Sequence, residues 1–180
     1  MRTLVYAMDV TLDGFIARDD GTCEALSCTA ESAAHRAVAA GDVDCVVTGR
    51  VAFEARVRDG LLRTWPALHQ VVVTQTLHPS AVPGVQLLGA DVASRIRDLK
   101  ASAGATILLA GGAELATTLM RHGLIDELSL CVHPVVFGSG IGLFTEGLAG
   151  VPLVRRQLVA GAAGRIHLRH AVVSQRGAVS

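Results

Sequence analysis

Two adjacent glycines, Gly111 and Gly112, have the surroundings best suited to chemistry in this sequence. The apolar run that precedes them, residues 107–110, is too short for a helix and is typical of a strand buried on both faces. Apolar residues then recur at helical spacing as far as Gly123. Because the first amides of a helix lack intrahelical partners and carry partial positive charge, a phosphate can bind there. The pair is also consistent with a plain tight turn, since no Gly-x-Gly-x-x-Gly or Walker pattern accompanies it.

Two other apolar, β-branched runs end in polar or glycine turns. These turns are Thr48-Gly49-Arg50 and Thr74-Gln75-Thr76. Strands alternate with helical patterns over this part of the chain, which predicts right-handed crossovers and a mainly parallel sheet. In such a sheet the connections that follow the strands line one edge, and ligands bind there. We therefore expect the three turns to converge.

The remaining patterns complete the expected fold. A strand over residues 4–8 leads to an Asp13-Gly14 turn, and a helix begins at Thr29 with Glu31 in its first turn and runs to residue 41. Asp91 is suited to cap a later helix. Residues 127–136, 153–159 and 165–173 are strand-like, with no helix between the last two. We predict a single α/β domain over residues 1–180, with a mainly parallel central sheet flanked by helices and antiparallel C-terminal strands.

Composition excludes several classes of protein. The 180 residues carry 16 basic and 16 acidic side chains, so nucleic acid and anionic membranes are not expected partners. No apolar run approaches the ~20 residues that cross a bilayer. The first acid comes too early for a signal peptide, and we expect a soluble cytoplasmic protein. The four cysteines form no Cys-x-x-Cys pair, and His167 and His170 would point to opposite faces of a strand, so no metal site is expected.

Taken together, the motifs resemble a known family. Residues 8–17, Met-Asp-Val-Thr-Leu-Asp-Gly-Phe-Ile-Ala, are similar to a family pattern x-S-L-D-G-x-I-A, and residues 48–50 match its G-R turn. Residues 107–114 resemble its strand-Gly-Gly-helix, and residues 124–140 its L-(I/V)-D-E-L…P-V-(L/V)-x-G-x-G. The family has the dihydrofolate reductase-like fold. The chain resembles its stand-alone members, which are similar to the C-terminal reductase domain of the bifunctional riboflavin-biosynthesis deaminase-reductase.

The resemblance implies hydride transfer from NADPH. It assigns the cofactor pyrophosphate to the glycine turn and the following helical amides, the nicotinamide to the first strand and its loop, and the adenosine end to the other two turns. The implied residues are, respectively, Gly111, Gly112, Ala113, Glu114 and Leu115; Ala7, Ile16 and Ala17; and Thr48, Gly49, Arg50, Thr74, Gln75 and Thr76. Arg50 is the candidate for the ribose 2′-phosphate, because a guanidinium matches two phosphate oxygens at once.

The sequence departs from the family where the adenosine end would lie. Val51, Ala52 and Gln75 stand where the family usually has polar or basic residues. NADH therefore stays possible beside NADPH. On the substrate side the candidate catalytic residues are Asp13, which also suits a structural turn, and Glu31, which also suits a helix-terminus acid. A carboxylate can bind an amidine-like ring edge through paired hydrogen bonds.

We expect an NAD(P)H-dependent reductase of a small heterocycle, pterin-like or pyrimidine-like, or of a carbonyl compound. The alternative is a catalytically silent dimer that keeps the fold as a nucleotide-binding or interaction module. A free-standing riboflavin-pathway reductase is a third possibility, and its sugar-phosphate substrate would need further basic residues. We also expect a homodimer, in which the apolar run of residues 128–136 packs against a second copy.

Overall fold

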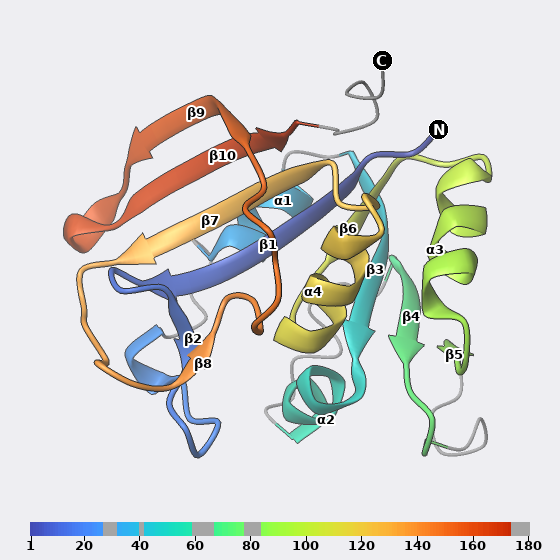
Figure 1. Cartoon of the computed structure of the whole chain (residues 1–180), viewed down its shortest axis with the longest axis horizontal. Coiled ribbons are helices and arrows are strands. Elements are labelled where there is room, and N and C mark those ends of the chain that lie inside the picture. The colour runs from blue at the N-terminus through green and yellow to red at the C-terminus, as the bar shows by residue number, and fades with distance from the viewer. Residues whose placement is uncertain (27–31, 40–41, 59–66, 78–83, 174–180) are drawn as a thin grey trace.

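The centre of the computed structural model is an eight-stranded sheet. The described residues are 1–26, 32–39, 42–58, 67–77 and 84–173. The strands are β1 (Leu4–Thr11), β3 (Val43–Gly49), β4 (His69–Val73), β5 (Val85–Leu88), β6 (Thr106–Leu109), β7 (Glu127–His133), β9 (Leu153–Ala160) and β10 (Ile166–Val172). Their order across the sheet is β5-β4-β3-β6-β1-β7-β10-β9 (Figure 1). A separate ribbon pairs β2 (Phe15–Ala17) with β8 (Ile141–Gly142).

Strand directions confirm the predicted fold class. Every pairing from β5 across to β7 is parallel, whereas β10 runs antiparallel to both β7 and β9. The expected strand over residues 127–136 is shorter, because β7 ends at His133, and it belongs to the parallel part of the sheet. The preceding helix returns the chain to the edge where β1 begins, so β7 starts in the direction of β1. Only β9 and β10 form the antiparallel addition.

Helices cover both faces of the sheet. Helices α3 (Val92–Ala101) and α4 (Ala113–Arg121) lie on the front face in Figure 1, and α1 (Ala33–Ala39) lies behind β1 and β7. Helix α2 (Arg50–Arg58) follows directly from the end of β3. No described helix is long and apolar enough to span a bilayer. The expected cap Thr29 and the candidate acid Glu31 lie outside the described residues.

The core is divided by the sheet into two layers. On the front face the strands pack against the apolar stripes of α3 and α4, with Tyr6, Ile96 and Leu119 fully buried. On the α1 face the buried cluster is smaller, and it combines Ala7 and Ala33 with Val46 and Leu108.

One predicted cap is wrong. Asp91 does precede α3, but its side chain makes no capping hydrogen bond, and its backbone has a φ of 57°. A capping side chain needs an extended backbone at its own position to reach back to the first helical amides. The left-handed conformation of Asp91 directs the carboxylate elsewhere.

Candidate functional site

The glycine turn lies against the neighbouring β3–α2 turn, as the sequence predicts. Strand β3 is paired with β6, and the N–H of Ala110, directly after β6, donates to the Val47 carbonyl near the end of β3. A Cβ placed on Gly112 would come within 3.8 Å of the Gly49 backbone. The two turns therefore form one continuous backbone surface at the C-terminal edge of the sheet.

Gly111 is a position where the close approach requires glycine. Its φ is +105°, and a Cβ there would lie 2.9 Å from the Cβ of Ala52 on α2. A side chain would add both backbone strain and a steric overlap. The absence of a Cβ thus lets the turn pack directly on the first turn of α2.

Helix α4 begins at this turn without a capping side chain. Its N-cap is Gly112, with φ 91° and ψ 95°, and the Ala116 N–H donates to the Gly112 carbonyl. The amides of Ala113, Glu114 and Leu115 precede that first helical bond and have no acceptor within the helix. These amides are suited to bind an anion. The first turn also carries one negatively charged side chain, the exposed Glu114.

The expected adenosine end is sparsely polar. Arg50 starts α2, and its Nη1 lies 2.8 Å from the Glu54 carboxylate, with both side chains about half exposed. Beside it Val51 is 70% exposed. Thr74 is buried, and its Oγ1 accepts from the amides of Thr76 and Leu77, so it shapes the turn after β4. Gln75 and Thr76 are exposed at that turn, while Thr48 is buried at the end of β3.

The loop after β1 is fastened to the loop before β8. The Asp13 carboxylate accepts hydrogen bonds from the amides of Phe137 (3.2 Å) and Gly138 (2.8 Å). Hydrogen bonds, chiefly that with the Thr11 side chain, lower the pKa of the exposed Asp13. These contacts are those of a residue that joins two loops. In the attached ribbon Ala17 is buried and Ile16 is half-buried, whereas Ala7 lies buried on the α1 face of β1.

A pair of polar side chains that the sequence analysis did not single out lies on the same face as Ala7. His133 Nε2 is 3.0 Å from Asp9 Oδ1, and only 7% and 15% of the two side chains are exposed. Tyr6 of β1 pairs with Leu109 of β6. Asp9 therefore lies three residues beyond that pair, at the edge where β6 gives way to the glycine turn. The available signal was a lone carboxylate in an apolar strand.

Cys131 completes this cluster. It is the register partner of Asp9 across β1 and β7, and its burial, reinforced by the Asp9 charge, raises the pKa of the thiol to about 12. Burial also raises the pKa of Asp9, although hydrogen bonds from His133, Cys131 and the Ala33 amide oppose the shift. The thiol is protonated at neutral pH and is therefore no nucleophile.

The cluster has the atom types that zinc prefers. Among the described residues, Asp9, Cys131 and His133 are the group that brings three such atoms together, all within 4.8 Å of one another. The hydrogen bonds within the cluster already use the carboxylate, the imidazole nitrogen and the protonated thiol. A hydrogen-bonded network accounts for this arrangement.

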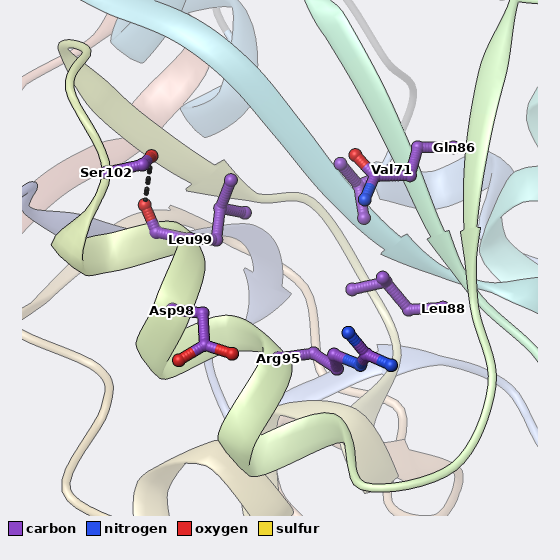
Figure 2. Close-up of a pocket in the computed structure, with 7 residues that line it drawn as sticks. All are labelled: Val71, Gln86, Leu88, Arg95, Asp98, Leu99 and Ser102. Atoms are coloured by element: carbon purple, nitrogen blue, oxygen red, sulfur yellow. Dashed lines mark hydrogen bonds between the residues drawn. The ribbon is translucent and has the colours of Figure 1, made fainter.

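Two cavities lie away from the glycine turns. One, of about 180 Å³, lies between α3 and strands β4 and β5, and Figure 2 shows the residues that line it. Ser102 there donates to the Leu99 carbonyl of its own helix. The other, of about 200 Å³, includes Val5, Arg36 and Thr106, near the beginnings of β1 and β6. Neither includes a residue of the three converging turns.

Comparison with known proteins defines the class of the chain. A family model described as the RibD C-terminal domain matches residues 2–160, and the protein belongs to this family. Two proteins of Bacillus subtilis are similar to it, each over 81% of the chain. The uncharacterized protein YwjB is 33% identical, with 83% of its own length covered, and the uncharacterized protein YyaP is 28% identical, with 81% covered.

Solved structures show the same fold. A putative riboflavin biosynthesis protein from Shewanella superposes with a TM-score of 0.79 at 21% identity, covering 97% of this chain and 100% of the other. RibD from Acinetobacter baumannii gives 0.71 at 20% identity over 96% of this chain, which spans 58% of that protein. Dihydrofolate reductase from Enterococcus faecalis, solved with NADP(H), gives 0.68 at 15% identity over 96% and 97% of the two chains. The dihydrofolate reductase-like fold is thereby confirmed.

Proposed function

We propose that the protein is an NADPH-dependent reductase that transfers a hydride to a small heterocycle, pterin-like or pyrimidine-like, or to a carbonyl compound. The observation that carries this proposal is the packing of the Gly111-Gly112 turn against Gly49 at the start of α4. Backbone amides without side chains above them suit a pyrophosphate. Membership of the RibD C-terminal domain family and the NADP(H) complex of a protein with the same fold support it.

Hydride transfer asks mainly for positioning. The cofactor supplies the hydride, and the protein holds its reactive ring against the acceptor and keeps water away. In the proposed arrangement the amides of Ala113, Glu114 and Leu115 bind the pyrophosphate, and Ala7, Ile16 and Ala17 lie beside the nicotinamide. Thr48, Thr74, Gln75 and Thr76 border the adenosine end. Arg50 exchanges its contact with Glu54 for the 2′-phosphate, which distinguishes NADPH from NADH.

Calorimetric titration of NADPH and NADH into wild type and Arg50→Ala tests the proposal. Loss of a charge-assisted hydrogen-bonding group is expected to weaken NADPH binding about tenfold or more and to leave NADH binding unchanged. Arg97→Ala, an exposed arginine on α3, is the matched control and should change neither. Absence of binding of either nucleotide at millimolar concentration would favour the silent-module alternative.

We further propose that the protein forms a homodimer through the front face of its antiparallel end. Strand β7 lies inside the sheet, and Leu128 and Cys131 are buried within the chain, so the expected contact through residues 128–136 moves outward to β10 and β9. There Leu168 and Leu158 continue the cross-strand row that begins at Leu130. Leu158 is 56% exposed and Ile166 is 40% exposed. A two-fold contact would bury such a patch.

Light scattering checks this dimer. Leu158→Lys places a charge on the proposed contact and should convert a dimer at micromolar concentration into a monomer. Gln157→Lys, one residue earlier on β9 and so facing the other side of the sheet, is the control. A monomeric wild type would contradict the proposal.

A further inference from the structure

We propose that Asp9 contacts the substrate ring of this reductase, and that Asp9 and His133 together supply the proton that accompanies the hydride. The inference rests on the proposed function and specifies its substrate side. It assigns recognition of a nitrogen heterocycle with an amidine-like edge to a carboxylate on β1, supported by an imidazole on β7.

Asp9 and His133 lie side by side on neighbouring strands, near the proposed cofactor site. Asp9 and His133 are 124 positions apart in the chain, and the parallel register of β1 and β7 brings them together. Both belong to the sheet face that also carries Ala7, two residues before Asp9. Asp9 also lies three residues beyond the Tyr6–Leu109 pair, beside the glycine turn that follows β6. A ring held against the proposed nicotinamide position would therefore meet this carboxylate.

The side chains of Asp9 and His133 are largely buried. A carboxylate that keeps 15% of its side chain exposed, and an imidazole that keeps 7%, are costly to place in a fold unless they are paired. The carboxylate accepts hydrogen bonds from His133, the Cys131 thiol and the Ala33 amide, which leaves one of its about four lone-pair sites for a ring N–H. The pair therefore places a carboxylate with some residual exposure at the end of β1, where a ring can contact it.

Among the residues that the structure describes, charged and titratable groups near the pair come from β7, α1 and the segment before β10. Cys131 contributes a protonated thiol from β7, and Arg36 of α1 and Arg165 before β10 act on Cys131 through their positive charges. The Ala33 amide at the start of α1 donates to Asp9. The hydrogen bonds from Cys131 and Ala33 favour the carboxylate form of Asp9 and oppose the effect of burial.

The proposed reaction is the reduction of a C=N bond of the substrate by a hydride and a proton. The hydride leaves C4 of the dihydronicotinamide and forms a C–H bond at the electrophilic carbon of a substrate C=N, whose π electrons move to nitrogen. That nitrogen takes a proton from the Asp9–His133 pair and becomes N–H. NADPH is oxidised to NADP⁺ and the C=N bond is reduced. The pair, which begins with one proton more than a carboxylate and a neutral imidazole, recovers that proton from water.

In this step His133 is a positioning residue. Its Nε2 holds Asp9 Oδ1 in place and holds the transferable proton, whereas Asp9 touches the ring. Glutamine at position 133 can still donate a hydrogen bond to Asp9 but cannot carry the extra proton. His133→Gln should therefore leave ring binding nearly unchanged while altering how that binding depends on pH.

The test uses 2,4-diaminopyrimidine as the probe, with 2,4-dimethylpyrimidine as a matched ligand that lacks the amino donors. Calorimetry on the full chain should show that Asp9→Asn weakens probe binding at least tenfold, because a hydrogen bond from a ring N–H to a neutral amide is weaker than one to a carboxylate. Asp98→Asn, on α3 and away from the pair, should not change it. In wild type the probe should shift the His133 ring signals in the NMR spectrum, which the spectrum of His133→Gln identifies.

Several outcomes would overturn the proposal: equal probe binding by wild type and Asp9→Asn, an unshifted His133 signal, or binding of dimethylpyrimidine as tight as that of the probe. Micromolar Zn²⁺ binding lost in both Asp9→Asn and Cys131→Ser would also overturn it, by making the cluster a metal site. NADPH titrations on the same samples separate the two proposals. If the probe binds through Asp9 but NADPH does not bind, the proposed reductase function is refuted and the ring-binding role of Asp9 stands. If NADPH binds but probe binding does not depend on Asp9, only the reductase proposal stands.

Discussion

The two halves of the C-terminal sheet edge are built from different chemistry. Where β3 and β6 end, the surface is backbone: Gly49, Gly111 and Gly112 bring main-chain atoms together, and Arg50 is the charged side chain at the first turn of α2. Where β1 and β7 end, the surface is a buried, titratable pair, Asp9 and His133. Backbone amides keep their charge distribution at every pH, whereas a carboxylate and an imidazole do not. A reductase needs both properties, a constant grip on its cofactor and a proton source for its substrate.

The largest expected effect comes from a substitution that disturbs the packed glycine turns at the ends of β3 and β6. Gly111→Ala introduces a methyl group 2.9 Å from the Ala52 Cβ at a φ of +105°. Strain and overlap should together cost about 3 kcal/mol of unfolding free energy and weaken NADPH binding tenfold or more. Denaturant unfolding and calorimetry measure both quantities.

Gly150→Ala is the control for the backbone effect. Its φ is +72°, and a Cβ there would meet nothing within 4 Å, so about 1 kcal/mol is expected from strain alone. Binding of 2,4-diaminopyrimidine should survive in Gly111→Ala, because Asp9 is on another strand. Unchanged stability and NADPH affinity in Gly111→Ala would contradict the close packing of the two turns.

The second effect is a dependence of stability on pH. Burial raises the pKa of Asp9 above its ordinary value of 3.8, so the folded chain holds this proton more tightly than the unfolded chain. The stability that Asp9 contributes is therefore greatest below pH 3.8 and is lost as the pH rises through the raised pKa. The difference in unfolding free energy between wild type and Asp9→Asn should fall as the pH rises through this window.

In Asp13→Asn the pH dependence of the unfolding free energy is expected to have the opposite sign. Hydrogen bonds lower the pKa of Asp13 from 3.8, so its contribution is present above pH 3.8 and is lost as the pH falls through the lowered value. Denaturant titrations at a series of pH values follow all three proteins. Parallel curves for the two aspartate variants would show that the two carboxylates do not differ as the structure indicates.

The smallest expected effect is the loss of a buried hydrogen bond at Tyr6, on the face of the sheet opposite to Ala7 and Asp9. Tyr6 is buried, its hydroxyl donates to the Leu143 carbonyl at 3.0 Å, and its ring meets Phe144 edge-on at 5.5 Å. Tyr6→Phe keeps the ring contact and should cost about 1 kcal/mol of unfolding free energy for the lost hydrogen bond. Because Tyr6 points away from the Ala7 face, NADPH and diaminopyrimidine titrations should match those of wild type. A change in either affinity would mean that the two layers of the core are coupled.

Much of the fold could be predicted because it depends on local patterns. Short β-branched runs ended by glycine or polar turns identified β3, β4 and β6, and helical spacing identified α4. The pairing of β7 with β1 could not be predicted, since a strand's own residues do not say which neighbour it pairs with. The cap at Asp91 also failed, because the side-chain type suits a cap while the backbone there is left-handed.

The candidate site divides in the same way. The glycine turns could be predicted from residue order, since Gly111 and Gly112 are adjacent and the groups suited to bind a phosphate are a few consecutive backbone amides. Only the tertiary structure brought Asp9 to His133 and fastened Asp13 to the loop at Gly138. Each of these contacts joins positions more than 120 residues apart, and strand register, which depends on the packing of the whole sheet, decides which side chains meet.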